Sequence, residues 1–189
     1  MISQGQAHKH LTYLTIEECP QFESLPEHMH ILSSLFYLWI HNCPKLELFP
    51  KGGLPSSLTE MNLNNCPKLV TTLKGALGAN SSLKTLSIGK LDTMCFPDQG
   101  LLPHHLNSLQ IYNCPNLQKL DYNGLSHLPS LKELVLKDCP SLQCLPEEGL
   151  PKSISDFKIS GKCSKLRQHC QLPNGDWGKI AHIENLNFE

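Results

Sequence analysis

The sequence lacks the marks of several large protein classes. It has no run of eighteen apolar residues that could cross a membrane, and its first ten residues, MISQGQAHKH, contain no apolar stretch of signal-peptide length. Lysine and arginine total 16 against 17 acidic residues, so no basic field exists to attract nucleic acid or anionic lipid. We expect a protein of the cytoplasm or nucleus with no membrane span and no nucleic-acid partner.

Common catalytic and metal motifs are also absent. No G-x-x-x-x-G-K-[ST] is present to hold a nucleoside triphosphate, and no G-x-S-x-G to present a nucleophile. No C-x-x-C or H-E-x-x-H occurs to bind zinc. We therefore expect no enzyme activity, no catalytic residue, no cofactor and no metal.

Two weaker chemical alternatives remain in the sequence. Cys144, in LQCLP, is a lone cysteine of the kind that can act as a nucleophile, but its place between two inward apolar positions favours a role in the wall of the fold. A few side chains come nearest to a metal-ligand set, and we interpret them as a surface loop and an end cap. They are His104, His105, Cys163, His169 and Cys170.

What the sequence does contain is nine cysteines, which we expect to be free thiols because no export signal is present. Five precede proline within similar segments: IEECPQFESLP, IHNCPKLELFP, LNNCPKLVTTL, IYNCPNLQKLD and LKDCPSLQCLP. These segments belong to one repeat, L-x-x-L-x-(I/L)-x-x-C-P-x-L-x-x-(L/F)-P. It starts at Leu11, Leu35, Leu58, Leu83, Leu106, Leu131 and Ile154, in steps of 24, 23, 25, 23, 25 and 23 residues. A period of about 20 to 29 residues built on L-x-x-L-x-L is the signature of a leucine-rich repeat.

The repeat predicts an α/β-type leucine-rich-repeat solenoid shaped like a horseshoe. In the second repeat, Leu38 and Ile40 alternate with polar or aromatic residues, the period of a short strand with one buried face. Seven such strands would form a parallel sheet on the concave face. The returns KGGLPSS, DQGLLPHH and EEGLPKS favour coil and short turns on the convex side, with at most one helical turn in GALGANSS and in NGLSHLPS.

Each Cys-Pro pair is interpreted as a corner of the chain. Cysteine is small enough to fill the corner and offers a weak thiol donor to the backbone, while proline stops the strand. Leu91 replaces the cysteine in the fourth repeat, and Cys163 comes one residue late in the seventh. We expect the regular stack to loosen at these two places.

The repeat also divides the chain. We predict an uncapped N-terminal segment over residues 1–10, a leucine-rich-repeat domain of about seven repeats over 11–170, and a C-terminal cap over 171–189. A solenoid leaves an apolar cross-section bare at its end, which a cap must cover. The residues expected to form that cover are Trp177, Ile180, Ile183 and Leu186.

The candidate binding residues lie on the predicted concave face. The first two repeats would bring aromatic side chains together there, flanked by Phe36, and exposed aromatics are common anchors of protein interfaces. The predicted protein-binding residues are Tyr13, Tyr37, Trp39, His41 and Tyr112. The alternative for Trp39 is packing on its neighbours along the sheet or on a preceding domain. Farther along, a mixed-charge patch is interpreted as a solvated face: Glu133, Lys137, Asp156 and Lys158.

The coils IHNCPKLELFP and LKDCPSLQCLP, the linkers GGLPSSL and EEGLPKSI, and the tail NGDWGKIAHI resemble a known family. They are similar to the C-terminal leucine-rich-repeat region of plant nucleotide-binding disease-resistance proteins of the coiled-coil class. This resemblance implies a module that recognises pathogen effectors or guarded host proteins and restrains a nucleotide-binding switch. The nucleotide-binding and coiled-coil domains of that family are not in this sequence, and Glu184 stands where its tail has proline.

The sequence therefore predicts a non-catalytic protein-recognition module of plant intracellular immunity. Its partner would be a pathogen effector, a guarded host protein or its own nucleotide-binding domain. One alternative is a substrate adaptor of a ubiquitin ligase, whose repeats also carry a cysteine after the strand. Another is a truncated receptor fragment with no function of its own.

Overall fold

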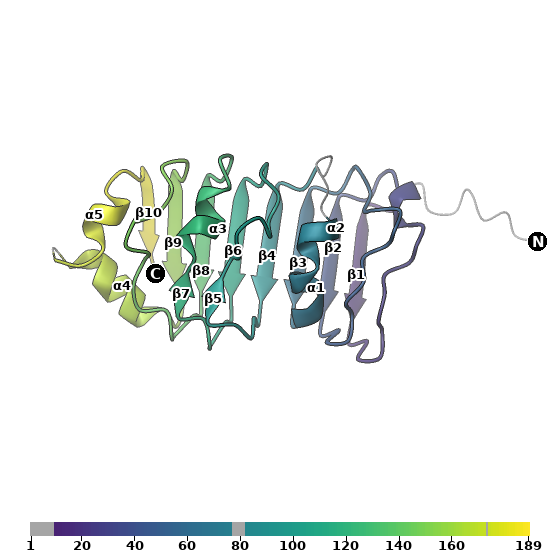
Figure 1. The fold of residues 1–189 in the computed structure, drawn as a ribbon, viewed down its shortest axis with the longest axis horizontal. Helices are drawn as coiled ribbons and strands as arrows, with labels where there is room; N and C mark the ends of the chain where they lie inside the picture. Colours follow the sequence, from purple (N-terminus) through teal and green to yellow (C-terminus); the bar gives the residue numbers. More distant parts are fainter. Residues whose placement is uncertain (1–9, 77–81, 173) are drawn as a thin grey trace, which may run out of the picture.

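The main element of the fold is a parallel β-sheet with eight strands in the order β1-β2-β3-β4-β6-β8-β9-β10 (Figure 1). It is seen in a computed structural model that describes residues 10–76, 82–172 and 174–189. The strands are β1 (Tyr13–Glu17), β2 (Tyr37–His41), β3 (Glu60–Asn64), β4 (Thr85–Gly89), β6 (Ser108–Tyr112), β8 (Glu133–Lys137), β9 (Asp156–Ser160) and β10 (Asn185–Phe188). The chain is thus an α/β fold with one parallel sheet and few helices. The predicted segment 1–10 lies outside the described residues except for its last residue.

Each repeat contributes one strand, and neighbouring strands pair without any offset. Tyr13 lies opposite Tyr37, which lies opposite Glu60, and the same correspondence continues from repeat to repeat. This zero offset follows from the sequence, because each strand begins two residues after the first leucine of its repeat. The seven predicted parallel strands are confirmed, and an eighth, β10, comes from the segment predicted as a cap.

The core lies on one side of this sheet and is formed by the repeated apolar positions. Leu38, Ile40 and Leu46 are fully buried, as are their counterparts in most later repeats. In β1 the same positions, Leu14 and Ile16, are only half-buried. The reason is that, among the described residues, β1 pairs with a neighbour on one side only.

Every strand of the seven repeats ends at a residue in the left-handed backbone conformation, directly after the strand. These residues, with φ between 53° and 64°, are Glu18, Asn42, Asn65, Lys90, Asn113, Asp138 and Gly161. In the first six, the backbone N–H donates to the carbonyl of the last residue in the next strand, as from Asn42 to Asn64 over 2.9 Å. The strand therefore stops at this residue, two positions before the proline that the sequence suggested as the stop.

The cysteines fill the corner as predicted. The Cys43 thiol is buried and donates to the carbonyl of His41 (3.4 Å), and the Cys66 thiol donates to that of Asn64 (3.3 Å) and reaches back to Ile40 (3.8 Å) in the preceding repeat. Burial raises the pKa of Cys66 to about 11, so this thiol is neutral near pH 7 and acts as a donor.

The expected loosening at the irregular corners is wrong. Leu91 is buried where the other repeats have cysteine, and its N–H donates to the thiol of Cys114 (3.4 Å). Cys163 is fully buried and accepts the N–H of Cys139 (3.1 Å). Gly161 holds the usual left-handed position, and the N–H of Cys163 donates to its carbonyl (2.9 Å), so a tight turn around the extra residue Lys162 brings the thiol into the corner.

The return segments contain more regular structure than their glycine and proline content predicts. They contain helices α1 (Pro67–Thr71), α2 (Leu73–Ala76), α3 (Tyr122–Ser126) and α4 (Ser164–Gln171) and a 3-10 turn (Met29–Ile31). They also contain a small sheet of β5 (Cys95–Phe96) with β7 (Lys119–Leu120). Helix α5 (Trp177–Ile180) lies in the C-terminal segment. Predicting mostly coil was wrong for α1 and α4. In α1, Pro67 occupies the first turn, where its missing N–H costs nothing, and Leu69 and Val70 are buried. Most of GALGANSS lies outside the described residues.

Buried Asp176 holds the C-terminal segment against the repeats. Its carboxylate lies 2.7 Å from Lys179 Nζ and 3.1 Å from His169 Nδ1, and it accepts the N–H of Leu145 in the sixth repeat (2.6 Å). Burial by itself raises the pKa of Asp176, but the hydrogen bonds from Lys179, the Leu145 N–H and His169 outweigh it and hold the pKa below its usual range. The carboxylate therefore stays ionised and connects the end of the chain to the stack.

The apolar cover predicted for this end is correct in part. Ile180 and Ile183 are buried, and Leu186 is half-buried on β10. Trp177 is instead 48% exposed, so its prediction as a core cover is wrong. It directly follows buried Asp176, and the interior position at the start of α5 is already taken by that carboxylate.

Replacing a core leucine tests the strand register. Leu38→Ala should lower the free energy of unfolding by about 2–5 kcal/mol, because it opens a cavity between β2 and the return segments. Chemical denaturation measures this loss. Leu48, in the same repeat but 55% exposed, is the control, and Leu48→Ala should change stability by less than about 0.5 kcal/mol. Equal effects would mean that the inward face is assigned wrongly.

Removing the Asp176 carboxylate tests the anchor of the C-terminal segment. Asp176→Ala should cost about 3 kcal/mol in urea denaturation at pH 7, since it removes the carboxylate that pairs with Lys179 and leaves the Leu145 N–H without its acceptor. Glu148→Ala, at an exposed carboxylate of the sixth repeat, should cost almost nothing.

The difference in stability between wild type and Asp176→Ala should also depend on pH, in a direction that the pKa of Asp176 defines. Because the folded-state pKa of Asp176 is lowered, its stabilisation is complete above the unfolded pKa of about 3.9 and disappears as the pH falls through the folded value. The stability difference between wild type and Asp176→Ala should therefore be constant from about pH 5 to 7 and shrink below about pH 4. A difference that grows on acidification would contradict this account.

Candidate functional site

The candidate site is the outward face of the sheet, formed by the residues two, four and six positions after each repeat start. On β2 these are Tyr37, Trp39 and His41, all half-buried, while Leu38 and Ile40 between them are fully buried. Alternate side chains of a strand point to opposite faces, so this alternation identifies the outward face. The zero offset between strands arranges these positions in three rows across the sheet.

An aromatic cluster, defined here as Tyr13, Phe36, Tyr37 and Trp39, occupies the first two strands of this face. The Tyr13 and Phe36 rings meet edge to face at 4.6 Å between centroids, and the Tyr13 and Tyr37 rings lie 5.4 Å apart. Trp39 is 6.1 Å from the ring of His41. The structure thus brings together four of the five predicted binding residues, flanked by Phe36 as expected.

The exposure of the cluster falls from β1 to β2. Tyr13 is 57% exposed, whereas Tyr37 and Trp39 are half-buried. Burial, with a smaller contribution from the nearby Glu60 carboxylate, raises the pKa of Tyr37, so its hydroxyl is protonated and can donate near neutral pH. Trp39 is partly buried against its neighbours, as the packing alternative predicts, and keeps part of its surface on the outward face, as a binding residue would.

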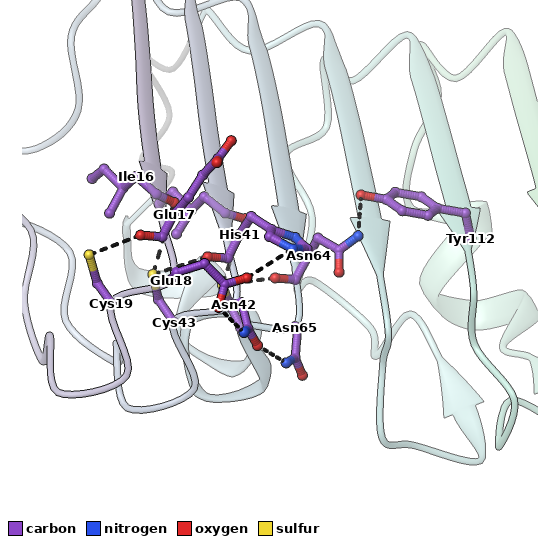
Figure 2. Close-up of polar contacts among 12 residues, drawn as sticks. Ile16, Glu17, Glu18, Cys19, His41, Asn42, Cys43, Asn64, Asn65 and Tyr112 are labelled. Atoms are coloured by element: carbon purple, nitrogen blue, oxygen red, sulfur yellow. Dashed lines mark hydrogen bonds and ion pairs between the residues drawn. The ribbon is translucent and has the colours of Figure 1, made fainter.

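His41 and the turn that follows its strand form a polar border to the cluster (Figure 2). His41 Nε2 lies 3.6 Å from Glu18 Oε1, and Asn42 Nδ2 donates to Glu18 Oε2 over 2.6 Å. Asn65 Nδ2 in turn donates to Asn42 Oδ1. Glu18, Asn42 and Asn65 are the left-handed residues that follow the first three strands, so His41 lies beside the turns that end these strands.

Tyr112, the fifth predicted residue, lies apart from the cluster on β6. Its hydroxyl accepts from Asn64 Nδ2 over 3.0 Å (Figure 2) and donates to Asn62 Oδ1 over 2.7 Å, and both asparagines lie on β3. The ring crosses Gly89 of β4, where an added Cβ would lie 2.5 Å from it. Burial raises the pKa of Tyr112. Tyr112 therefore forms a bridge within the sheet, which the sequence could not indicate because its partners lie 48 and 50 residues away.

The mixed-charge patch lies at the other end of the face. Lys158 Nζ donates to Glu133 Oε1 (2.8 Å), and Ser108 donates to the second oxygen of that carboxylate (2.7 Å). The hydrogen bond from Lys158, followed by that from Ser108, lowers the pKa of Glu133. These charges are largely satisfied within the protein.

The cysteine and histidine alternatives find little support in the geometry. Cys144 is exposed, so its prediction as a wall residue is wrong; Leu142 and Leu145 take the inward positions and leave it outside. Within the described ranges, no group of three or more potential ligands could hold a metal ion. His104 instead contacts the carbonyl of His127 (2.8 Å), and burial raises the pKa of Cys170 to about 12.

Over 181 residues, the chain is 33% identical to a protein of Arabidopsis thaliana named as the disease resistance protein At3g14460. The chain is related to a plant disease resistance protein. The match covers 95% of this chain and 13% of that protein, so the chain corresponds to a small part of its relative's length. No family model matches the sequence, and no solved structure matches it. In the parts of the chain that the structure describes, no helix is long and apolar enough to cross a membrane.

Removing the Tyr112 hydroxyl tests the bridge across the sheet. Tyr112→Phe should lower the free energy of unfolding by about 1–2 kcal/mol, because buried Asn64 loses its side-chain partner. The matched control is Tyr13→Phe, since the exposed Tyr13 hydroxyl has no hydrogen bond among the described residues, and it should be neutral. If both changes have the same effect in thermal or chemical denaturation, the bridge contributes nothing.

Proposed function

We propose that this chain is a non-catalytic protein-recognition module of plant intracellular immunity, built as a curved leucine-rich-repeat solenoid. The seven-fold repeat with one parallel strand per repeat supports the solenoid. Similarity to a disease resistance protein along almost the whole chain supports the role in defence. The proposed partner is a pathogen effector, a guarded host protein or, within a longer receptor, a nucleotide-binding domain that the module restrains. The proposed location is the cytoplasm or nucleus.

The aromatic cluster is the observation that carries this proposal. The Tyr13 ring contacts those of Phe36 and Tyr37 at one end of the outward face, Trp39 lies on the adjoining part of β2, and Tyr13 remains largely exposed. Large rigid rings bury much area at a small cost in conformational entropy, which makes them common anchors of protein interfaces. Apart from Val135, the outward positions of the later strands are polar, small or internally paired, so the cluster is where a partner would gain most from contact.

The ubiquitin-ligase adaptor is the weaker alternative. Such adaptors have a helical convex side, and helices α1 to α4 lie in the return segments of this chain too. The similarity to a disease resistance protein along 95% of the chain nevertheless favours the defence role.

Exchange of Trp39 tests the proposed surface. The tagged chain is expressed in plant tissue, its bound proteins are identified, and the affinity of each for purified variants is measured by calorimetry. Trp39→Ala should weaken binding by about 2 kcal/mol or more with folding nearly intact. The control Val135→Ala, at the equivalent position on β8, should bind as wild type. A partner that binds wild type and Trp39→Ala equally would remove the aromatic cluster as the contact surface.

A further inference from the structure

Carboxylates are the charged groups at the outward positions beside the aromatic cluster, and the exposed Lys84 lies just before β4. On the outward face of β1, β2, β3 and β4, the described residues include Glu17 and Glu60 but no lysine or arginine. Glu60 is the direct neighbour of Tyr37 across the sheet, and Glu17 is the neighbour of His41. Both glutamates are exposed. Two exposed carboxylates therefore border the cluster on the outward face.

Glu60 differs from the glutamate at the same repeat position on β8. Glu133 is bound by Lys158 and Ser108. Among the described residues, the Glu60 side chain has no hydrogen bond or ion pair. Its charge acts on the Tyr37 hydroxyl and contributes to the raised pKa of that group. An exposed carboxylate that lies next to aromatic rings and has no cation partner can bind a positively charged group of another molecule.

The chemistry of the cluster favours a guanidinium group. A cation over the face of tryptophan or tyrosine is attracted by the ring quadrupole. A guanidinium group can stack on such a ring and also donate two hydrogen bonds to a carboxylate in one plane, which an ammonium group cannot do. Trp39 lies between the short side chains of Thr15 and Asn62 across the sheet, so its neighbours in that row are smaller than its indole.

We propose that the aromatic cluster and Glu60 form a binding site for an arginine side chain of a protein partner. This inference rests on the proposed function and specifies the chemistry of the partner. The arginine would stack on the Tyr37 or Trp39 ring and donate to the Glu60 carboxylate. A partner surface with an exposed arginine beside apolar residues would fit this end of the sheet.

Two short peptides test the site without knowledge of the natural partner. They are acetyl-Gly-Arg-Gly-amide and the same peptide with citrulline, which keeps the shape of arginine but carries no charge. The chain has two tryptophans, and Trp177 lies in α5 at the far end of the sheet (Figure 1). In the nitrogen-15 NMR spectrum of the full chain, the indole signal of Trp39 therefore reports the site and that of Trp177 serves as an internal control.

The arginine peptide should shift the Trp39 signal in a saturable way and leave the Trp177 signal in place. The affinity of the citrulline peptide should be lower than that of the arginine peptide by at least about fivefold. Glu60→Gln should weaken the arginine peptide about threefold without affecting the citrulline peptide. Glu133→Gln, at the equivalent position on β8, should leave both unchanged. Equal binding of the two peptides, no shift of Trp39 with either, or no effect of Glu60→Gln would overturn the proposal.

The outcome separates this inference from the proposed function. If a protein partner depends on Trp39 but the peptides show no preference for arginine, recognition by the cluster stands and the arginine site is refuted. If the peptides show a preference for arginine but no protein partner depends on Trp39, this surface binds arginine, and the aromatic cluster is refuted as the contact surface of the proposed function.

Discussion

The structure depends on one hydrogen bond that is repeated at the ends of the first six strands of the sheet. A residue in the left-handed conformation turns the chain out of the sheet, and its N–H donates to the last carbonyl of the next strand, from Glu18 to His41 at one end and from Asp138 to Ser160 at the other. The bond links consecutive repeats at the same position each time. It therefore fixes both the zero offset of the strands and the corner that the cysteine thiols then fill.

Zero offset has a direct consequence for the outward face. Because backbone hydrogen bonds and the buried leucines stabilise the fold, the residues at the outward positions can differ from repeat to repeat without disturbing it. The first two strands use them for aromatic rings, β4 uses the small residues Thr85, Ser87 and Gly89, and β8 and β9 use paired charges. The absence of a side chain at Gly89 allows Tyr112 to reach across to β3. The surface is thus varied along its length while the scaffold remains constant.

The sequence predicts the inward half of this structure well, because leucines at fixed spacing must be buried together. The left-handed position could also have been found, since Asn42, Asn65, Asn113, Asp138 and Gly161 are residue types that tolerate positive φ. The sequence does not distinguish helix α1, because Pro67 can stop a strand and is also favoured in a first helical turn. The roles of Tyr112 and Asp176 are not predictable from the sequence. The partners of Tyr112 lie on β3, about 50 residues earlier, and Asp176 accepts the backbone N–H of Leu145 in the sixth repeat.

The central claim is that a protein partner contacts the aromatic end of the outward face. A photoreactive amino acid placed at Thr15, a small residue beside Trp39, tests it most directly, with the same group at Gln110 on β6 as the comparison. After irradiation in plant tissue, the account predicts a covalent adduct of the chain with another protein from position 15 and little or none from position 110. An adduct that forms only from position 110, or equally from both, would contradict it.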